Sequence, residues 1–478
     1  MKFMRSVNAA AAASSAMTAP RSLDVKDLVS VRNVAATLAF DAMSYYKGNL
    51  SAADSVNMGD LQDPYYWWTA GALWGSMLDY YHFTNDSTYN DVVIQALLTP
   101  TNLGAQHAYM PSEHAFEEGN DDLFFWGSAA IAAAERNFPQ PNSTLPSWLD
   151  LGANVFNQLA SRWSNQHCGG GLLWQIYASN PNGLTYKNSV SNGGFFQIAA
   201  RMARATGNDT YLDWADKVWD WSMDIGFIDH ESFHVYDGAG IDTNCTKTNV
   251  ASFTYTSGIY LYGAAIMANY TKKPEWAQRT RQLLDGVGWF FTPPNATAKN
   301  VMYEGACETV GRCDADMTTF KAYLARFMWQ TTQMVPSLRS KVESLLIPSA
   351  QAAAATCTGG STGRACGQKW YTGEYDNIPG LGQEMNALET IQGLLIDGAA
   401  PPLEAKDIKT VRDVTWEAQG AQSAKASDAS TPTPLETARR GISGDAKPTN
   451  SAGARPSLEM GPLVVVGVGM LLATWGLA

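Results

Sequence analysis

The chain has 478 residues, enough for one large domain or for two or three of average size. Its formal net charge is −12 and it contains no block of Lys and Arg, which excludes nucleic acids and anionic membrane surfaces as partners. Hydrophobic residues make up 45% of the chain and charged residues only 16%, with 16 Trp, 20 Tyr and 17 Phe. Aromatic rings fill cores and also stack on sugar rings, so this surplus suits a large core that carries a carbohydrate cleft.

The amino terminus has only some features of a secretory signal. Lys2 and Arg5 supply a positive start, but the stretch from Val7 to Ala19 is mostly Ala and Ser and almost lacks Leu. We expect residues 1–19 to be a signal peptide that is removed near Ala19. A truncated start of the chain is the alternative.

Residues 24–398 show apolar spacings of three and four, and no strand-like alternation competes with them. The pattern predicts an all-α catalytic domain over this range. Loops rich in Gly, Pro, Asn and Asp separate the helical segments. We expect twelve helices, at 27–46, 65–83, 88–98, 122–137, 147–163, 191–206, 209–225, 253–270, 274–291, 317–332, 338–355 and 382–397.

A short repeat indicates that the helices are paired. The stretch Thr84–Tyr89 is echoed by Thr206–Tyr211, in each case between two predicted helices. An Asp or Ser before the Thr-Tyr pair can cap the next helix, and Gly207 suits the left-handed residue that ends the previous one. Six hairpins could close into a double ring whose inner helices line a funnel. An open α-solenoid would use the same segments, and spacing does not separate the two.

The cysteines and glycosylation sequons point to a secreted protein. Six Cys occur without a CxxC pair, which favours disulfides over a zinc or redox site. Local pairing of near neighbours would leave two distant cysteines for each other, although other pairings stay open. The expected bonds are Cys307–Cys313, Cys357–Cys366 and Cys168–Cys245. Seven Asn-x-Ser/Thr sequons occur, at Asn49, Asn85, Asn142, Asn208, Asn244, Asn269 and Asn295.

The carboxyl terminus resembles a signal for attachment of a glycosylphosphatidylinositol (GPI) anchor. Residues 399–456 are rich in Ala, Ser, Thr, Pro and Gly, which predicts a flexible stalk. Small residues near Asn450 could be the attachment site, and residues 461–478 form an apolar tail with no basic residue after it. A tail-anchored helix is the alternative, but it would usually have Lys or Arg on its inner side.

The most informative stretch is the acid pair Asp121 and Asp122 at the start of a predicted helix. Cleavage of a glycosidic bond needs one carboxyl group to protonate the leaving oxygen and a second to attack the sugar or activate water. Neighbouring residues on a helix point about 100° apart, so both groups can face one sugar only from a loop or first turn. On spacing alone helix capping is the favoured explanation of such a pair, and Glu117 and Glu118 are less favoured alternatives as the working acids. The six His lack metal-ligand spacing, so we expect no metal and no cofactor.

Several motifs, in order along residues 27–397, resemble glycoside hydrolase family 76. Those motifs are Tyr65–Trp68, Glu117–Gly127, Cys168–Ile176, Tyr186–Ser189, Ser191–Gly193, Tyr236–Gly238, Tyr255–Gly263 and Phe320–Arg326. The chain is most similar to the family's fungal GPI-anchored mannan endo-1,6-α-mannosidases. The resemblance implies an (α/α)6 barrel and a retaining mechanism, with Asp121 as nucleophile, Asp122 as general acid/base and their carboxyl groups about 5 Å apart. Leu123 departs from the fungal pattern, which usually has Gln there.

Within this resemblance we assign supporting roles in sugar binding. The candidate stacking rings are Trp68, Trp126, Trp174 and Tyr255, and the candidate hydroxyl contacts are Asn120, Gln175, Lys187, Asn188, Asn192 and Asp237. The expected function is cleavage of α-1,6-mannan, or of the mannose core of GPI anchors with transfer of the glycan to wall glucan. The alternative is a catalytically silent mannan-binding wall protein. We expect a monomer that is lipid-anchored at the outer face of the plasma membrane or held in the cell wall.

Overall fold

The computed structural model describes residues 17–48, 58–140, 145–180 and 183–409. Every predicted helix is present in this part of the chain, and most ends agree within three residues. The twelve long helices are α2 (Leu28–Met43), α3 (Trp67–Thr84), α4 (Asn90–Leu98), α6 (Asn120–Glu135), α7 (Trp148–Arg162), α8 (Ser189–Thr206), α9 (Asp209–Asp224), α10 (Thr254–Thr271), α11 (Pro274–Gly286), α12 (Phe320–Met334), α13 (Arg339–Thr356) and α14 (Leu381–Gln392). A four-residue helix, α5 (Pro100–Leu103), follows α4.

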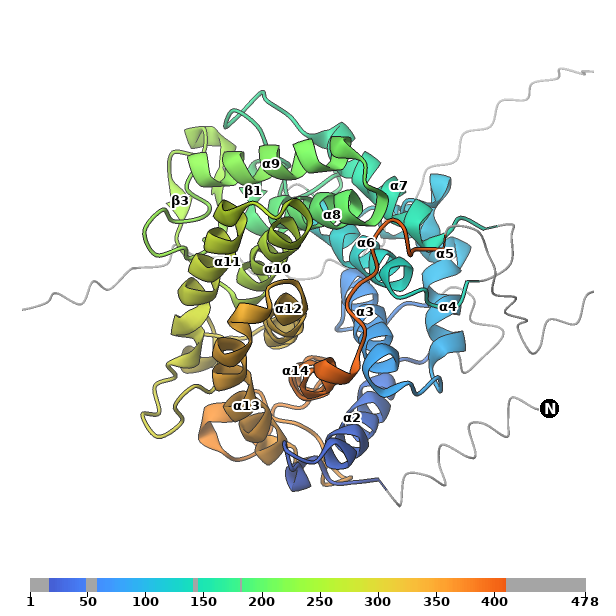
Figure 1. Ribbon diagram of the computed structural model, residues 1–478, viewed down its shortest axis with the longest axis vertical. Coiled ribbons are helices and arrows are strands. Elements are labelled where there is room, and N and C mark those ends of the chain that lie inside the picture. Colours follow the sequence, from blue (N-terminus) through green and yellow to red (C-terminus); the bar gives the residue numbers. More distant parts are fainter. Residues whose placement is uncertain (1–16, 49–57, 141–144, 181–182, 410–478) are drawn as a thin grey trace, which may run out of the picture. The chain divides into compact units, whose positions relative to one another are not determined.

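The helices form two concentric layers. Helices α3, α6, α8, α10, α12 and α14 pack each against the next, and α14 packs back against α3, so the inner ring is closed. Helices α2, α4, α7, α9, α11 and α13 pack outside them, as Figure 1 shows. Contact between α14 and α3 closes the ring, which an open solenoid lacks. The predicted all-α (α/α)6 barrel is confirmed.

The inner helices are more completely buried than the outer helices. Nearly every residue of α8 and α10 is buried, because an inner helix touches two inner neighbours and an outer one. The outer helix α9 buries one stripe that includes Ala215, Val218 and Trp219. An outer helix such as α9 therefore shows an amphipathic pattern in the sequence, whereas the inner helices also bury polar side chains such as Arg201, Arg326 and Glu389.

The predicted repeat of helix ends is confirmed and has a third copy, but the predicted caps are wrong: Asn208 caps α9, and α4 has no side-chain cap. Thr84, Thr206 and Thr271 each end an inner helix, and each hydroxyl donates to the carbonyl oxygen four residues before it. The residue that follows each Thr is left-handed, with φ of 69° at Gly207 and 59° at Lys272. The third copy was missed because Lys272 replaces the Gly or Asn expected there.

All three expected disulfides are present, namely Cys168–Cys245, Cys307–Cys313 and Cys357–Cys366. The described chain also contains a small sheet that the apolar spacing did not indicate. Three short strands, β1 (Tyr186–Asn188), β2 (Gly238–Gly240) and β3 (Thr248–Asn249), form an antiparallel sheet in the order β1-β2-β3. Each is two or three residues long, too short to show an alternating pattern.

The flexible stalk was predicted to begin at residue 399, but residues 399–409 belong to the folded domain. Leu403 N donates to Glu135 O at 2.8 Å, and Arg204 Nη1 donates to the carbonyl oxygens of Pro402 and Leu403. This segment therefore packs on the helical domain, and a stalk can begin no earlier than residue 410. The predicted attachment site and apolar tail, with residues 1–16 of the predicted signal peptide, lie outside the described residues. None of the described helices is both long and apolar enough to span a membrane.

Candidate active site

The candidate site lies where the inner helices begin. Outer and inner helices alternate along the chain from α2 to α14, so the inner helices share one direction and their first turns gather at one end of the ring. We call this end the mouth. Trp68 is the second residue of α3, Asp121 and Asp122 lie in the first turn of α6, and Tyr255 is the second residue of α10. Asn188 caps α8.

The acid pair occupies the first turn of α6, as predicted. Asp122 Oδ2 accepts a hydrogen bond of 2.6 Å from Gly119 N, so Asp122 also completes the cap of this helix. Asp121 Oδ2 accepts from Asn188 Nδ2 at 3.3 Å, whereas Asp121 Oδ1 is buried and has no hydrogen-bond partner. A Cβ atom at Gly119 would lie 2.4 Å from Asp121 Oδ1, so the turn needs a glycine there. Capping and chemistry are thus compatible, with Asp122 doing the capping.

The pKa values of both carboxyl groups are raised. Burial is the main cause at Asp121, where the pKa rises to about 7 although Asn188 donates a hydrogen bond to it. Burial and then the neighbouring charge of Asp121 raise the pKa of Asp122 well above its usual range. Two close carboxyl groups in a site poor in water cannot both ionise easily, so the pair holds a shared proton near neutral pH. The higher pKa of Asp122 places that proton on Asp122.

Four predicted binding residues lie around the pair. Asn188 contacts Asp121 directly, and the charge of Asp237 raises the pKa of Asp121. Asp237 accepts hydrogen bonds from Tyr186 OH at 2.7 Å and Asn249 Nδ2 at 3.0 Å, which fix its carboxylate. Tyr255 is half-buried, stacks on Phe320 with 3.8 Å between ring centroids, and lies near Asp121 and Asp237. Trp68 donates from Nε1 to Asp316 Oδ1 at 3.1 Å.

Trp126 and Lys187 were predicted to touch substrate, and the structure contradicts both roles. Trp126 is fully buried and stacks between Trp67 and Tyr109, so no sugar can reach its ring. Lys187 is 1% exposed, and its Nζ donates to carbonyl oxygens of the loop before it, including His167 O at 2.9 Å. Both side chains build the wall of the site.

Three predicted amide contacts are also structural. Asn192 is fully buried and bonds to both the N–H and the carbonyl of Leu172. Asn120 is 2% exposed, donates to Leu173 O and accepts from Arg162 Nε at 2.6 Å. Gln175 is 5% exposed and pairs through its backbone with Gly119, so it holds the turn that carries the acid pair. A contact with sugar through Trp174, which is half-buried beside Gly119, stays a prediction.

Two further acids lie near the pair. Asp316 was not among the predicted site residues, and Glu118 was only a less favoured alternative. Asp316 precedes α12, and burial raises its pKa to about 7, with further contributions from Asp314 and Asp121. Its position just before an inner helix is the signal that could have identified it. Glu118 is fully buried, has no hydrogen-bond partner for either carboxyl oxygen, and has a pKa raised by burial to about 8. In the part of the chain that the structure describes, no three His, Cys, Asp or Glu side chains are arranged to hold a metal ion.

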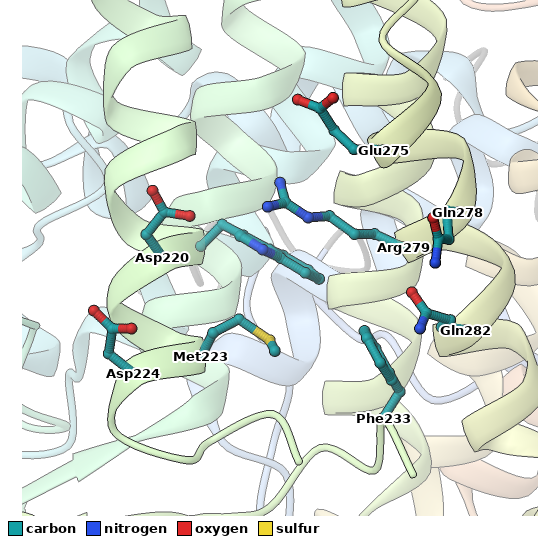
Figure 2. Close-up of a pocket in the computed structure, with 9 residues that line it drawn as sticks. Asp220, Met223, Asp224, Phe233, Glu275, Gln278, Arg279 and Gln282 are labelled. Carbon is teal, nitrogen blue, oxygen red and sulfur yellow. The ribbon is translucent and has the colours of Figure 1, made fainter. Parts of the chain in front are cut away.

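A second hollow lies away from the mouth, between the outer helices α9 and α11. Figure 2 shows Asp220, Met223 and Asp224 facing Arg279 across it. The Arg279 guanidinium lies over the rings of Trp276 and Trp219, at 4.3 and 5.2 Å from their centroids. Arg279 thus helps to join two outer helices, and the hollow holds none of the acid-pair residues.

Comparisons with known proteins agree with this geometry. The model of glycosyl hydrolase family 76 matches residues 30–406. The mannan endo-1,6-alpha-mannosidase DCW1 of Saccharomyces cerevisiae is 44% identical over 381 residues, which cover 79% of this chain and 82% of that protein. The Dfg5 structure from Chaetomium thermophilum, in complex with glucosamine, is 39% identical with a TM-score of 0.76 and covers 81% of this chain and 95% of that one.

A more distant structure shares the fold. It is an inactive variant of the α-1,6-mannanase GH76A from Salegentibacter sp. HEL1_6, with two consecutive Asp replaced by Asn, in complex with α-1,6-mannotriose. It is 18% identical with a TM-score of 0.60, and the match covers 76% of this chain and 99% of that one. At this identity the likeness supports the barrel alone.

A closed (α/α)6 barrel with two adjacent carboxyl groups of raised pKa at its mouth defines a class of enzymes that cleave glycosidic bonds. The family match extends over most of the chain, and the relatives align over most of their own length. The chain belongs to glycosyl hydrolase family 76 and is a glycoside hydrolase.

Proposed function

We propose that this enzyme cleaves α-1,6-linked mannosides with retention of configuration, and that Asp121 is the nucleophile and Asp122 the general acid/base. The observation that carries the proposal is the unequal pair in the first turn of α6. Asp121 has the lower pKa and a hydrogen-bond donor in Asn188, which favours its ionised form. Asp122 has the higher pKa and keeps the proton.

In the first step, the proton of Asp122 passes to the glycosidic oxygen as the bond from that oxygen to C1 breaks. Asp121 attacks C1 with a lone pair of its carboxylate and forms a mannosyl ester. The leaving sugar departs as an alcohol, and Asp122 is left as a carboxylate.

In the second step, the Asp122 carboxylate removes a proton from an acceptor hydroxyl, whose oxygen attacks C1 and releases Asp121. If the acceptor is water the reaction is hydrolysis, and if it is a sugar hydroxyl the reaction is transfer. We propose transfer as the main outcome, with the mannose core of a GPI anchor as donor and wall glucan as acceptor. Both outcomes use the same two carboxyl groups.

The relatives support the choice of substrate. Several curated relatives from yeasts bear the name mannan endo-1,6-alpha-mannosidase. The inactive Salegentibacter variant has two consecutive Asp replaced, and residues 121 and 122 are the one place in this sequence where two Asp are consecutive. The glucosamine bound to the Dfg5 relative supports a glycan that includes an amino sugar.

We also propose a location at the outer face of the plasma membrane or in the cell wall, through a GPI anchor attached near Asn450. The apolar ending at residues 461–478 and the sequons support this location. Release of the full-length protein from intact cells by a phosphatidylinositol-specific phospholipase would test the anchor. A protein that stays bound after this treatment and leaves the wall only after glucanase digestion would instead be linked to wall glucan.

Product analysis tests the reaction. The protein is incubated with an α-1,6-mannoside donor and a glucan oligosaccharide acceptor, and the products are separated by mass and anomeric configuration. A mannosyl-glucan product of retained configuration is expected. Free mannosides alone would reduce the function to hydrolysis, and binding without any product would favour the catalytically silent mannan-binding protein.

Asp121→Asn and Asp122→Asn separate the two roles. Both are expected to be inactive on a natural mannoside. On an aryl mannoside, whose leaving group needs no proton, Asp122→Asn should still form the covalent intermediate, whereas Asp121→Asn should not. The reverse result would exchange the two roles.

A further inference from the structure

A buried turn in the loop before α12 carries two glutamates that the mechanism does not use. Residues 304–308 form this turn, in which Glu308 N donates to Glu304 O at 3.0 Å. Both side chains are fully buried. Burial of a carboxyl group away from water is costly unless hydrogen bonds or a charge partner compensate for it. The contacts that compensate here lead to the first turns of two inner helices.

Glu304 caps α10 from outside the helix. Its Oε2 accepts hydrogen bonds from Thr254 N at 2.9 Å and from Thr254 Oγ1 at 2.6 Å. Thr254 is the first residue of α10, and Phe253, which precedes the helix, supplies no side-chain cap. The first amide groups of a helix have no partner within it, and a carboxyl group beside them is also favoured by the helix dipole. Glu304 thus fixes the turn that carries Tyr255.

Glu308 binds the next inner helix, α12. Its Oε1 pairs with Lys321 Nζ at 2.8 Å, and Lys321 is the second residue of α12. The ammonium group of Lys321 also lies over the Trp370 ring, 3.9 Å from its centroid. This salt bridge anchors the turn 304–308 against α12, while Glu304 reaches across to α10. The two glutamates therefore join the first turns of neighbouring inner helices.

Tyr255 and Phe320 lie directly beside these two contacts. Tyr255 follows Thr254, Phe320 precedes Lys321, and the two rings stack with 3.8 Å between centroids and 13° between planes. Phe320 is buried and covers one face of the Tyr255 ring, which is itself half-buried. Tyr255 is the second residue of α10, as Asp121 is of α6, so both lie in the same layer of the mouth. The other face of the ring is thus placed to stack on a sugar.

We propose that Glu304 is a positioning residue, which holds Tyr255 against Phe320 as the platform for the sugar bound at Asp121. The inference rests on the proposed function, because Glu304 acts on the substrate only through Tyr255. Its role is carried by the hydrogen bonds from Thr254 and not by its negative charge. Both bonds go to one oxygen, so an amide oxygen in the same place can replace the carboxylate oxygen.

Two conservative variants of the full-length protein separate reach from charge. Glu304→Gln keeps an acceptor oxygen at the same length and removes the charge, so its KM for an α-1,6-mannoside should equal that of the wild type. Glu304→Asp keeps the charge but is one methylene shorter, so it loses Thr254 and KM should rise about 5- to 10-fold. The value of kcat should stay within about two-fold in both, because the acid pair is held separately at Gly119. A raised KM in Glu304→Gln would overturn the proposal, also in the case that Glu304→Asp does not fold.

A double-mutant cycle tests whether Glu304 acts through Tyr255. Tyr255→Ala removes the platform and should itself raise KM. Once the ring is gone, Glu304→Asp should add no further increase, because nothing remains for Glu304 to position. Increases in KM that simply multiply would mean that Glu304 acts by another route, and would overturn the proposal.

Ser349 provides the control for a general loosening of the same segment. It is fully buried in α13, and its Oγ accepts a hydrogen bond from Met302 N at 3.0 Å, two residues before Glu304. Ser349→Ala should lower thermal stability and leave KM unchanged, because a smaller folded fraction lowers the apparent kcat alone. A KM as high in Ser349→Ala as in Glu304→Asp would assign the effect to the packing of the segment instead of to Glu304.

Amide hydrogen exchange, followed by mass spectrometry, tests the same contact without substrate. The amides of residues 254–256 should exchange several-fold faster in Glu304→Asp than in the wild type, and at the wild-type rate in Glu304→Gln. Unchanged exchange in Glu304→Asp would overturn the positioning role even in an enzyme that cleaves mannosides. A wild type without activity on mannosides would instead refute the proposed function, and the exchange rates would still decide whether Glu304 holds the first turn of α10.

Discussion

Two regions of the barrel differ in whether their buried charges are paired. Toward the ends of the inner helices, Arg326 donates to Glu389 at 2.7 Å and pairs with Asp79 at 3.2 Å. Arg201 pairs with Glu135 at 2.7 Å in the same layer. Arg136, which ends α6, pairs with Asp79 and joins the two groups, so the network links α3, α6, α8, α12 and α14, five of the six inner helices. Each charge there has a partner of opposite sign.

At the mouth Lys321 pairs with Glu308 at 2.8 Å in a buried salt bridge. Asp121, Asp122, Asp237 and Asp316, in contrast, have no cationic partner among the described residues. Burial raises the pKa values of Asp121, Asp122, Asp237 and Asp316, and each raised pKa marks a charge that folding makes less favourable. The barrel can build paired charges, as its opposite end shows. These four unpaired carboxyl groups are therefore placed to bind a ligand and do not stabilise the fold.

The largest effect is expected from Asp121→Asn. Loss of the nucleophile should lower kcat by about 10⁴-fold or more, measured on an α-1,6-mannoside. The same variant should be more stable than the wild type at alkaline pH. A variant that keeps most of its activity would show that the acid pair is only a cap.

The stability of Asp121→Asn depends on pH in a definite direction. The pKa of Asp121 is about 7 in the folded protein against 3.8 for an ordinary Asp, so the folded state binds the proton more tightly. Stability of the wild type therefore falls as pH rises between these two values. The gain from Asn should be absent near pH 4 and full above about pH 7, as measured by thermal unfolding. A gain of equal size at both pH values would assign it to something other than this carboxyl group.

The opposite end should respond to mutation in stability instead of chemistry. Arg326→Met leaves Glu389 without its cation in a buried site, and we expect a loss of about 3–5 kcal/mol in the free energy of unfolding. Arg339 is the control, since it pairs with Glu343 at the surface, where it is 24% exposed. Arg339→Met should cost at most about 1 kcal/mol. Urea unfolding measures both, and equal losses would remove the distinction between buried and exposed pairs.

The helices could be predicted from sequence because the apolar period recurs along each of them. Closure of the ring could not, since it depends on α14 meeting α3, two helices about 300 residues apart in the chain. The strands β1, β2 and β3 are too short to carry a pattern. The segment 399–409 looked like a stalk by composition, yet Arg204 and Glu135 bind its backbone.

The candidate site was predicted in part. The residue types of the acid pair suit the chemistry, but spacing alone favoured a helix cap, and only the resemblance to family 76 motifs assigned the pair to catalysis. Its place in a first turn followed from helix geometry. The surrounding residues were chosen because they lie in family motifs. A motif does not distinguish a residue that faces the substrate from a residue buried behind the site. Trp68 and Trp126 both lie near the starts of inner helices, but Trp126 is fully buried and Trp68 reaches Asp316. Asp316 belongs to no motif, and only its position in the loop before the inner helix α12 could have identified it.

A smaller effect is expected from Asn188→Ser. Asn188 Oδ1 caps α8 through Ser191 N, and its Nδ2 donates to Asp121. Serine keeps a capping oxygen but is too short to reach Asp121, so the pKa of Asp121 should rise further. The acid limb of the pH profile of kcat/KM should move up by about half a unit to one unit. A pH profile that does not move would mean that Asn188 acts only as a cap.

The smallest effect compares the two indole groups. Trp68→Phe removes the donor to Asp316 Oδ1, so the carboxylate is less fixed and the pKa of Asp316, already about 7, should rise. The loss of stability of the protein between about pH 4 and pH 7 should therefore be larger in Trp68→Phe than in the wild type, as measured by thermal unfolding at both pH values. Trp126 is the matched control, because its Nε1 has no hydrogen-bond partner. Trp126→Phe should lower thermal stability through lost packing by a similar amount at both pH values. If Trp126→Phe changed the pH dependence as much as Trp68→Phe, that dependence would reflect the packing of the mouth instead of the hydrogen bond to Asp316.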